Sequence, residues 1–238
     1  MIGTSGNKPL IVRCGRLVCA LAGFIAVLSL PATRFEVQAQ SSSFTNAVSM
    51  SVDNLESNKT TIWENGVGEG FHAGAQSFSV NAGATYGIAA FGSVQAHDLA
   101  MISFTYGHML GHILGEGHWY RGNFEFRIEL FTGAQFSPET EWFVGLTPHL
   151  RYNLATGTRW IPFADIGTGV TATGIGPPDL SGTFEFNLQG GGGIHWFLKD
   201  NLALTLEARY VHWSCAGINK PNLGLNGVTG MLGATFFF

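Results

Sequence analysis

The chain has 238 residues, a formal net charge of −4 and only 12% charged residues, together with 33 glycines and 19 phenylalanines. Removing residues 1–39 would take away four basic residues and one acidic residue, so the remainder is more acidic still. This balance argues against nucleic acid as a partner, because nucleic-acid binding calls for a basic surface. Few charges and many aromatic residues suit a protein whose outer face meets something other than water.

Residues 1–39 have the features of a secretory signal peptide. Three basic residues precede an apolar run from Leu17 to Leu30, and a small-residue cleavage site ends at Ala39. Two of the three cysteines lie in this segment, so its removal leaves Cys215 alone. The mature chain is therefore predicted to contain no internal disulfide and to form one domain of roughly 200 residues.

Residues 40–75 are rich in Asn, Ser and Glu and are predicted to form a periplasmic segment ahead of the first strand. No stretch beyond residue 39 approaches the run of about 20 apolar residues that a membrane helix needs. Only a closed barrel could then span a bilayer with its backbone polar groups satisfied.

Alternation of apolar and polar residues with a period of two recurs through the rest of the chain and predicts strands. It is clearest from Phe124 to Leu130, where apolar residues alternate with Glu125, Arg127 and Glu129. Eight segments are predicted as strands: 78–86, 100–106, 124–130, 142–152, 160–170, 184–189, 202–210 and 228–238. We therefore predict an all-β fold, an eight-stranded antiparallel transmembrane β-barrel over residues 76–238.

A soluble β-sandwich is the alternative, because half-buried strands also alternate. Two features favour the membrane barrel: its outward residues are mostly aromatic and large aliphatic, and the chain ends on an aromatic residue, Phe238. A terminal aromatic resembles the sorting signal of outer-membrane barrels. The predicted location is therefore the outer membrane.

Turn lengths predict the orientation of the barrel. Tight turns are expected at 155–157 and 199–201 and longer links near 173–182 and 215–226. Short turns face the periplasm in such barrels and long loops face outward, so the seventh strand rises toward the outside. The link at 108–117 is longer than this orientation predicts.

The seventh strand ends in the candidate chemistry. His212 and Ser214 are two residues apart, so they project side by side from one face of the strand. Both continue the apolar even-numbered series of Leu202, Leu204 and Leu206, so they are predicted to face lipid at the outer end of the barrel. An ionisable pair in such a place indicates function. A histidine beside a serine can activate the hydroxyl for acyl transfer.

The segment 212–226 resembles the lipid A 3-O-deacylase (PagL) family of eight-stranded outer-membrane barrels. The family pattern is His-x-Ser followed by Asn-Ala-Gly, a Pro-Asn pair and a third triad member, and the matching stretch here consists of residues 212, 214, 216–217, 221–222 and 224. The resemblance implies a carboxylic ester hydrolase that acts on lipid A of the outer-leaflet lipopolysaccharide. It implies Ser214 as the nucleophile and His212 as the general base.

The third member of the family's triad is often a glutamate, and Asn226 takes its place here. An Asn carbonyl can still orient the imidazole, although it stabilises an imidazolium less than a carboxylate would. Cys215 also stands where the pattern often has asparagine. The side chain of Asn222 and the backbone N–H groups near Ala216 and Gly217 are the candidate oxyanion donors.

Other constellations are weaker. His108, His112 and His118 lie near one another without a carboxylate in a recognised ligand pattern, so neither a metal nor another cofactor is expected. The glycine run 190–193 is interpreted as a bend or a close-packing site. A non-catalytic structural or adhesion barrel and acyl transfer to an acceptor other than water remain alternative functions. The sequence makes no prediction of the oligomeric state.

Overall fold

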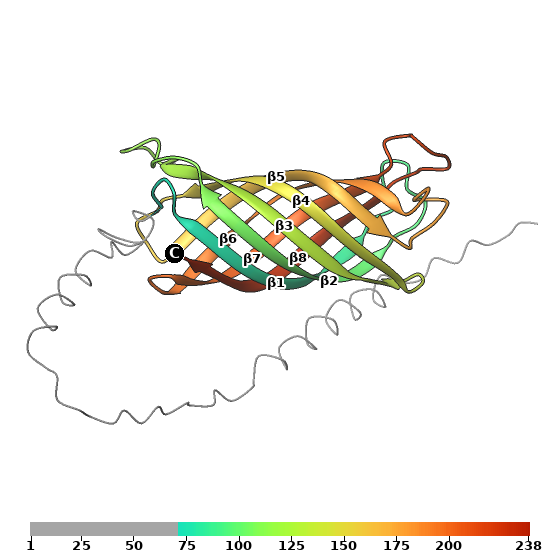
Figure 1. Cartoon of the computed structure of the whole chain (residues 1–238), viewed down its shortest axis with the longest axis horizontal. Helices are drawn as coiled ribbons and strands as arrows, with labels where there is room; N and C mark the ends of the chain where they lie inside the picture. The colour runs from blue at the N-terminus through green and yellow to red at the C-terminus, as the bar shows by residue number, and fades with distance from the viewer. Residues whose placement is uncertain (1–70) are drawn as a thin grey trace, which may run out of the picture.

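The computed structural model describes residues 71–238, and these form a closed antiparallel barrel (Figure 1). The predicted signal peptide and most of the predicted segment 40–75 lie outside the described residues. Consecutive strands pair in order, and the first pairs with the last. The strands are β1 (Gln76–Gly87), β2 (Asp98–Met109), β3 (Gly122–Ser137), β4 (Glu141–Leu154), β5 (Trp160–Thr173), β6 (Phe184–Lys199), β7 (Leu202–Ser214) and β8 (Leu225–Phe237).

All eight predicted segments fall on these strands, and the predicted eight-stranded barrel is confirmed. Residue 238 lies one position beyond β8, where its carbonyl accepts a hydrogen bond from the backbone N–H of Gln76 at 2.9 Å. Within residues 71–238, no helix is long and apolar enough to cross a membrane.

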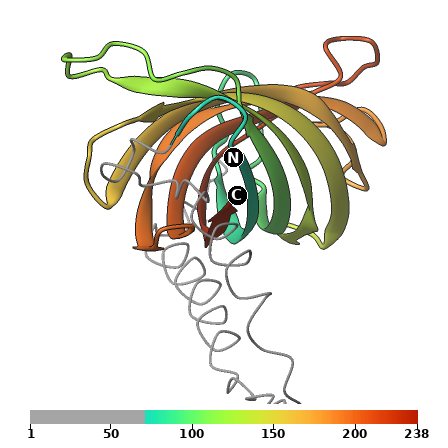
Figure 2. The same ribbon diagram turned by 60° about the vertical axis from the view of Figure 1, so that its left-hand side comes forward.

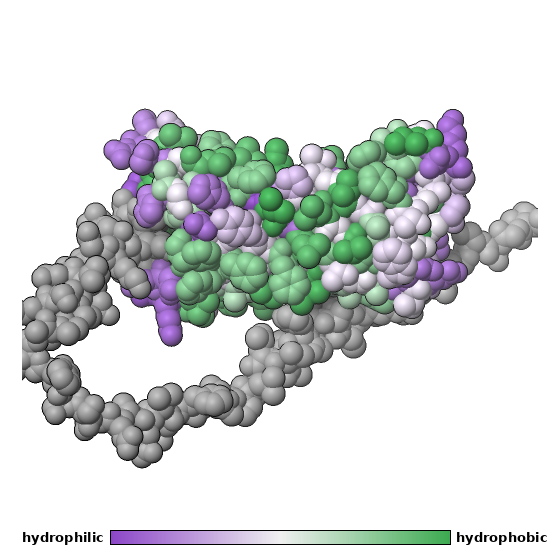
Figure 3. Space-filling model, viewed as in Figure 1, coloured by the Kyte–Doolittle hydropathy of each residue, from purple (hydrophilic) through white to green (hydrophobic). Residues whose placement is uncertain are grey.

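The outer wall of the barrel is apolar. Its exposed side chains come from alternate strand positions, so a strand with one charged face can present a continuous apolar face outward. Figure 3 shows this apolar wall between two more hydrophilic ends. Aromatic residues mark both ends of the wall, with Trp160 stacked on Trp196 near one end and Trp142 and Phe184 exposed near the other. Such aromatic girdles are typical of membrane-spanning barrels.

The lumen is filled by two apolar plugs separated by a charged layer. The plug at the end that holds the C-terminus consists of Phe71, Ala75, Met109, Ile161, Phe197, Ala203 and Phe237. The plug at the other end consists of Leu99, Phe131, Phe143, Ile175, Leu180, Trp213 and Leu225. Phe71 belongs to the segment predicted as a periplasmic lead-in, and its ring packs edge-on against Phe237 with centroids 5.4 Å apart.

Between the plugs, arginines and carboxylates form a buried ion-pair network. Arg209 binds Glu129 at 2.6 Å and Glu207 at 2.9 Å, and Arg151 binds Asp165 at 2.7 Å and Glu207 at 2.8 Å. Glu207 therefore points into the barrel, where its side chain is buried and its carboxylate accepts from Arg151. The network closes the lumen because its side chains bridge strands on opposite walls.

Replacing Arg209 with methionine is expected to destabilise the barrel by about 3–5 kcal/mol, because Glu129 would keep a buried charge without its principal partner. The free energy of unfolding in detergent or lipid vesicles measures this loss. Lys199→Met, which removes an exposed cation at the end of β6, is the matched control and should change stability little. Equal stability of the Arg209 variant and the control would contradict this interpretation.

Loops of different length gather at the two ends. The short connections 155–159 and 200–201 lie at the end with the C-terminus, and the longer loops 88–97, 174–183 and 215–224 lie at the opposite end together with the three-residue connection 138–140. The β2–β3 link, residues 110–121, is long although it lies at the short-turn end, and Figures 1 and 2 show it projecting away from the barrel. β7 therefore runs toward the end that carries the longer loops.

Candidate active site

The last residues of β7 place three polar side chains on the outer wall. Tyr210, His212 and Ser214 alternate with Arg209, Val211 and Trp213, which are buried in the lumen. The even-numbered side chains are half-buried, on the same face as the exposed Leu206. The structure therefore places His212 and Ser214 on the lipid-facing wall, at the end of the strand that meets the long loops.

A chain of hydrogen bonds connects Ser214, His212 and Asn226. His212 Nε2 lies 3.2 Å from Ser214 Oγ, and His212 Nδ1 lies 2.8 Å from Asn226 Oδ1. Asn226 is the direct cross-strand partner of His212 on β8, which explains how residues 14 positions apart come together. The three residues predicted as the catalytic set are thus contiguous in space.

The orientation of the Asn226 amide determines which nitrogen of His212 carries the proton. Asn226 Nδ2 donates to the carbonyl of Ala90 at 2.8 Å, so Oδ1 is the atom that faces the imidazole. An amide oxygen only accepts hydrogen bonds, so the neutral ring carries its proton on Nδ1. Nε2 is then the free acceptor beside the Ser214 hydroxyl, as a general base requires.

Two groups that sequence reasoning missed support Asn226. The hydroxyl of Tyr210 donates to Asn226 Oδ1 at 2.5 Å, and the carbonyl of Ala90 accepts from Nδ2. Asn226 is only 1% exposed although its position faces outward, because these neighbours cover it. Tyr210 could have been predicted as a neighbour of the site, because the period-two pattern places it on the same face of the strand as His212. Nothing in the sequence indicated Ala90, because a backbone carbonyl has no residue signature.

Gly224 holds the loop against the imidazole of His212. Its φ is +84°, and a Cβ at this position would lie 2.8 Å from His212 Cε1. Both the left-handed backbone and the close approach require glycine here. The loop thereby forms one wall of the histidine's environment.

Replacing Gly224 with alanine is expected to lower kcat by roughly 100-fold, because the added methyl group must displace the imidazole from Ser214. Steady-state kinetics on the purified, folded variant would measure the change. Gly157→Ala is the matched control: Gly157 has φ +70° and no atom within 4 Å of an added Cβ. If the two variants retained equal activity, the contact with His212 would have no part in the effect.

The candidate oxyanion donors lie in the turn that follows Ser214. Asn222 Oδ1 accepts a hydrogen bond from the backbone N–H of Cys215 at 3.3 Å, which brings the Asn222 amide next to the serine. Ala216 and Gly217 are exposed and have φ values of +54° and +79°. The backbone N–H of Gly217 is directed to the Cys215 thiol, so Asn222 is the stronger candidate of the three.

The side chain of Cys215 points away from Ser214 into a buried contact under the loops. Ser181 Oγ donates to Cys215 Sγ at 3.0 Å, and this hydrogen bond is the largest cause that lowers the pKa of the thiol. Cys215 contributes its backbone rather than its side chain to the serine's surroundings. Because the side chain at position 215 does not reach Ser214, a cysteine can occupy the position where the family pattern often has asparagine.

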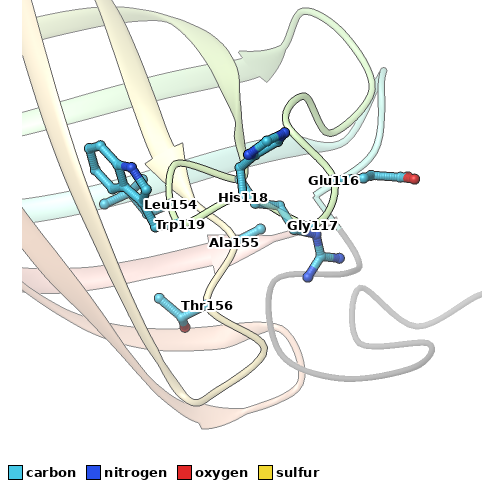
Figure 4. Close-up of a pocket in the computed structure, with 8 residues that line it drawn as sticks. Glu116, Gly117, His118, Trp119, Leu154, Ala155 and Thr156 are labelled. Carbon is cyan, nitrogen blue, oxygen red and sulfur yellow. The ribbon is translucent and has the colours of Figure 1, made fainter.

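A hollow of about 670 Å³ lies at the opposite end of the barrel, between the β2–β3 link and the β4–β5 turn (Figure 4). Glu116, His118 and Trp119 line it from the link, and Ala155 and Thr156 line it from the turn. The ring of His118 stacks on Tyr120, with centroids 5.0 Å apart. Across the described part of the chain, no group of three or more His, Cys, Asp and Glu side chains could hold a metal ion.

Comparisons with known proteins find one family model and several solved structures that this chain resembles. Residues 142–235 match the family model described as Lipid A 3-O-deacylase (PagL), a span that contains His212, Ser214 and Asn226. This match confirms the resemblance drawn from residues 212–226. A search of curated protein sequences found no match.

Several solved structures resemble the fold of this chain. The crystal structure of the outer membrane enzyme PagL has 19% sequence identity and a TM-score of 0.47, and the alignment covers 66% of this chain and 97% of that one. Neisserial surface protein A (NspA) has 14% identity and a TM-score of 0.48, with 69% and 96% covered. OprG from Pseudomonas aeruginosa has 11% identity and a TM-score of 0.44, with 70% and 97% covered. At these identities the similarity concerns the fold.

Proposed function

We propose that this chain, whose residues 142–235 match the lipid A 3-O-deacylase (PagL) family, hydrolyses an ester-linked acyl chain of lipid A in the outer membrane. The observation that carries the proposal is the hydrogen-bonded chain of Ser214, His212 and Asn226 on the outer wall. The predicted outer-membrane location is supported by the family match and by the outer-membrane barrels that share the fold.

In the proposed reaction, Ser214 Oγ attacks the carbonyl carbon of the ester while His212 Nε2 takes the hydroxyl proton. Asn226 Oδ1 holds the Nδ1–H of the resulting imidazolium. When the tetrahedral intermediate collapses, the bond between the acyl carbon and the sugar oxygen breaks, and His212 returns its proton to that oxygen. Water then attacks the acyl-enzyme with His212 as base, which releases the fatty acid and restores the Ser214 hydroxyl.

The oxyanion of the tetrahedral intermediate is assigned to Asn222. Its Oδ1 is held by the backbone of Cys215, so its amide nitrogen remains available as a donor beside Ser214. A donor of this kind typically contributes about 3 kcal/mol to transition-state stabilisation. The amide nitrogen of Asn226 instead donates to the carbonyl of Ala90.

A shallow apolar groove beside the site suits an acyl chain. It has a volume of about 310 Å³, and its lining is almost entirely apolar: Phe126, Pro148, Leu150, Ile166, Gly167 and Leu188, with His149 and Thr168. Leu188 on β6 is the direct cross-strand partner of His212, so the groove begins one strand away from the imidazole. Its open side faces the bilayer, where a lipid tail can enter without leaving an apolar medium.

The position of the site along the barrel favours lipid A as the substrate class. Ser214 ends β7 at the end of the barrel that carries the longer loops, which faces the cell exterior in such barrels. The lipid of that leaflet is lipopolysaccharide, whose ester-linked chains lie at the level of the polar boundary. The reaction is written as hydrolysis, although transfer to another acceptor would begin with the same acyl-enzyme.

Mass spectrometry of lipid A tests the proposal directly. Cells that express the wild-type chain should lose the mass of one hydroxyacyl chain from lipid A, whereas cells that express Ser214→Ala should not. Both proteins must be shown to be folded in the outer membrane at equal abundance. Unchanged lipid A with both proteins would refute the deacylase and would favour the alternative, a non-catalytic structural or adhesion barrel.

A further inference from the structure

A single buried carboxylate joins the loops that surround the candidate site. Asp179 lies in the β5–β6 loop and is 0% exposed. Its side chain accepts from the backbone N–H of Val94 at 3.1 Å, from that of Gln95 at 3.0 Å and from Ser93 Oγ at 3.2 Å. His97 Nε2 lies 3.0 Å from the same carboxylate. All four partners belong to the β1–β2 loop.

The backbone of Asp179 holds a second loop. Its carbonyl accepts from the N–H groups of Leu223 at 3.1 Å and Gly224 at 2.8 Å, in the β7–β8 loop. One residue therefore connects three loops that come from different parts of the sequence. Gln135 of β3 also anchors this cluster, because its Oε1 lies 2.7 Å from His97 Nδ1.

Two short routes lead from Asp179 to the imidazole of His212. On the first route, the carbonyl of Asp179 holds the backbone N–H of Gly224, and Gly224 lies so close to His212 Cε1 that a side chain would not fit between them. The second route begins with the hydrogen bond between Asp179 and the hydroxyl of Ser93. The backbone N–H of Ser93 donates to the carbonyl of Ala90 at 3.1 Å, and the same carbonyl accepts from Asn226 Nδ2. Asn226 Oδ1 then contacts His212 Nδ1. Both routes end on the general base.

The carboxylate is not required to close the barrel. Every strand is paired with both neighbours, and the charged layer and the two plugs hold the lumen without Asp179. A buried carboxylate needs several donors to offset its desolvation, and backbone N–H groups in loops meet that need only if the loops are fixed. The hydrogen bonds of Asp179 therefore serve to hold the loops in place.

On the basis of the proposed function, we propose that Asp179 is a positioning residue for catalysis. It fixes the β1–β2 and β7–β8 loops so that Ala90 orients Asn226 and Gly224 confines His212. The imidazole then keeps its Nε2 toward Ser214. Asp179 acts through these groups and does not itself contact Ser214 or the ester.

Asp179→Asn tests the route through the side chain, Ser93 and Ala90, because the amide keeps the size of the side chain but turns an N–H donor toward groups that themselves donate, and it leaves the backbone carbonyl that holds Gly224 unchanged. We expect kcat to fall by about 10- to 100-fold while KM changes less than about threefold, since the imidazole is misplaced and the groove for the acyl chain is untouched. Glu185→Gln is the matched control: Glu185 of β6 is buried at the same end of the barrel, and its carboxylate accepts from the backbone N–H of Ser181 in the adjoining loop. The control should retain its kcat.

A second measurement does not depend on turnover. In ¹⁵N-histidine NMR spectra of the protein in detergent micelles, the wild type and the Glu185 variant should show the Nδ1–H form of His212, and Asp179→Asn should broaden or shift that signal. An unchanged signal together with an unchanged kcat would overturn the proposal, as would equal losses of kcat in both variants. If the wild type failed to cleave lipid A, the proposed function would fall, and the His212 signal would still decide whether Asp179 positions the imidazole.

Discussion

Replacing Ser214 with alanine is expected to reduce kcat for lipid A deacylation by roughly 10⁵- to 10⁶-fold, the scale seen when a hydrolase loses its nucleophile. The reason is chemical: the hydroxyl 3.2 Å from His212 Nε2 is the atom that would form the acyl-enzyme. KM should change little, because the alanine side chain leaves the apolar groove intact. Purified wild type and variant, assayed on lipid A in mixed micelles, provide the measurement.

His212→Ala should cause a loss of similar size, and the double variant should be no worse than either single variant, because the two residues act as one unit. Thr158→Ala, a hydroxyl removed from the short β4–β5 turn, is a suitable control for the loss of an exposed hydroxyl. Retention of more than a tenth of the activity by Ser214→Ala would mean that another group is the nucleophile.

Replacing Asn226 with leucine is expected to lower kcat by about 10³- to 10⁴-fold, comparable to the loss when the orienting member of a hydrolase triad is removed. Leucine has a similar size but no acceptor for His212 Nδ1–H, so the ring can adopt the tautomer in which Nε2 carries the proton. The Tyr210 hydroxyl and the Ala90 carbonyl would also lose their partner. The measurement is the pH dependence and size of kcat, with KM determined in the same assay.

Asn226→Asp separates the orienting role from the structural one. Aspartate keeps an oxygen toward His212 and Tyr210 but turns the other oxygen toward the carbonyl of Ala90, which lies 2.8 Å from the present amide nitrogen. It should therefore retain more activity than the leucine variant while losing some stability. Equal activity of the wild type and the leucine variant would remove Asn226 from the mechanism.

The strands and their outward faces could be predicted because a period of two is a local property. The alternation from Phe124 to Leu130 can be read without reference to the rest of the chain, and the same alternation predicted that His212 and Ser214 face outward. The eight-stranded closure then follows from the number of such segments. The adjacency of His212 and Ser214 needed nothing more than their spacing along one strand.

The contacts between segments could not be predicted in this way. The register that sets His212 opposite Asn226 depends on the pairing of β7 with β8 across ten loop residues. Asn226 was therefore predicted from the family resemblance and not from the alternation of apolar and polar residues. Asp179 carried no local signal, since one acidic residue in a glycine- and proline-rich loop is ordinary. Phe71 was likewise assigned to a lead-in without a role, although its ring fills the end of the lumen.

The filled lumen determines where the reactants of the proposed hydrolysis can come from. Among the described residues, two apolar plugs and an ion-paired layer fill the lumen between the end that holds the C-terminus and the end that holds Ser214. In the proposed hydrolysis, we therefore expect the water that cleaves the acyl-enzyme to arrive from the side of the longer loops, and the liberated fatty acid to leave sideways into the bilayer. The acidity and ionic composition of the surroundings, rather than those of the periplasm, would then govern turnover.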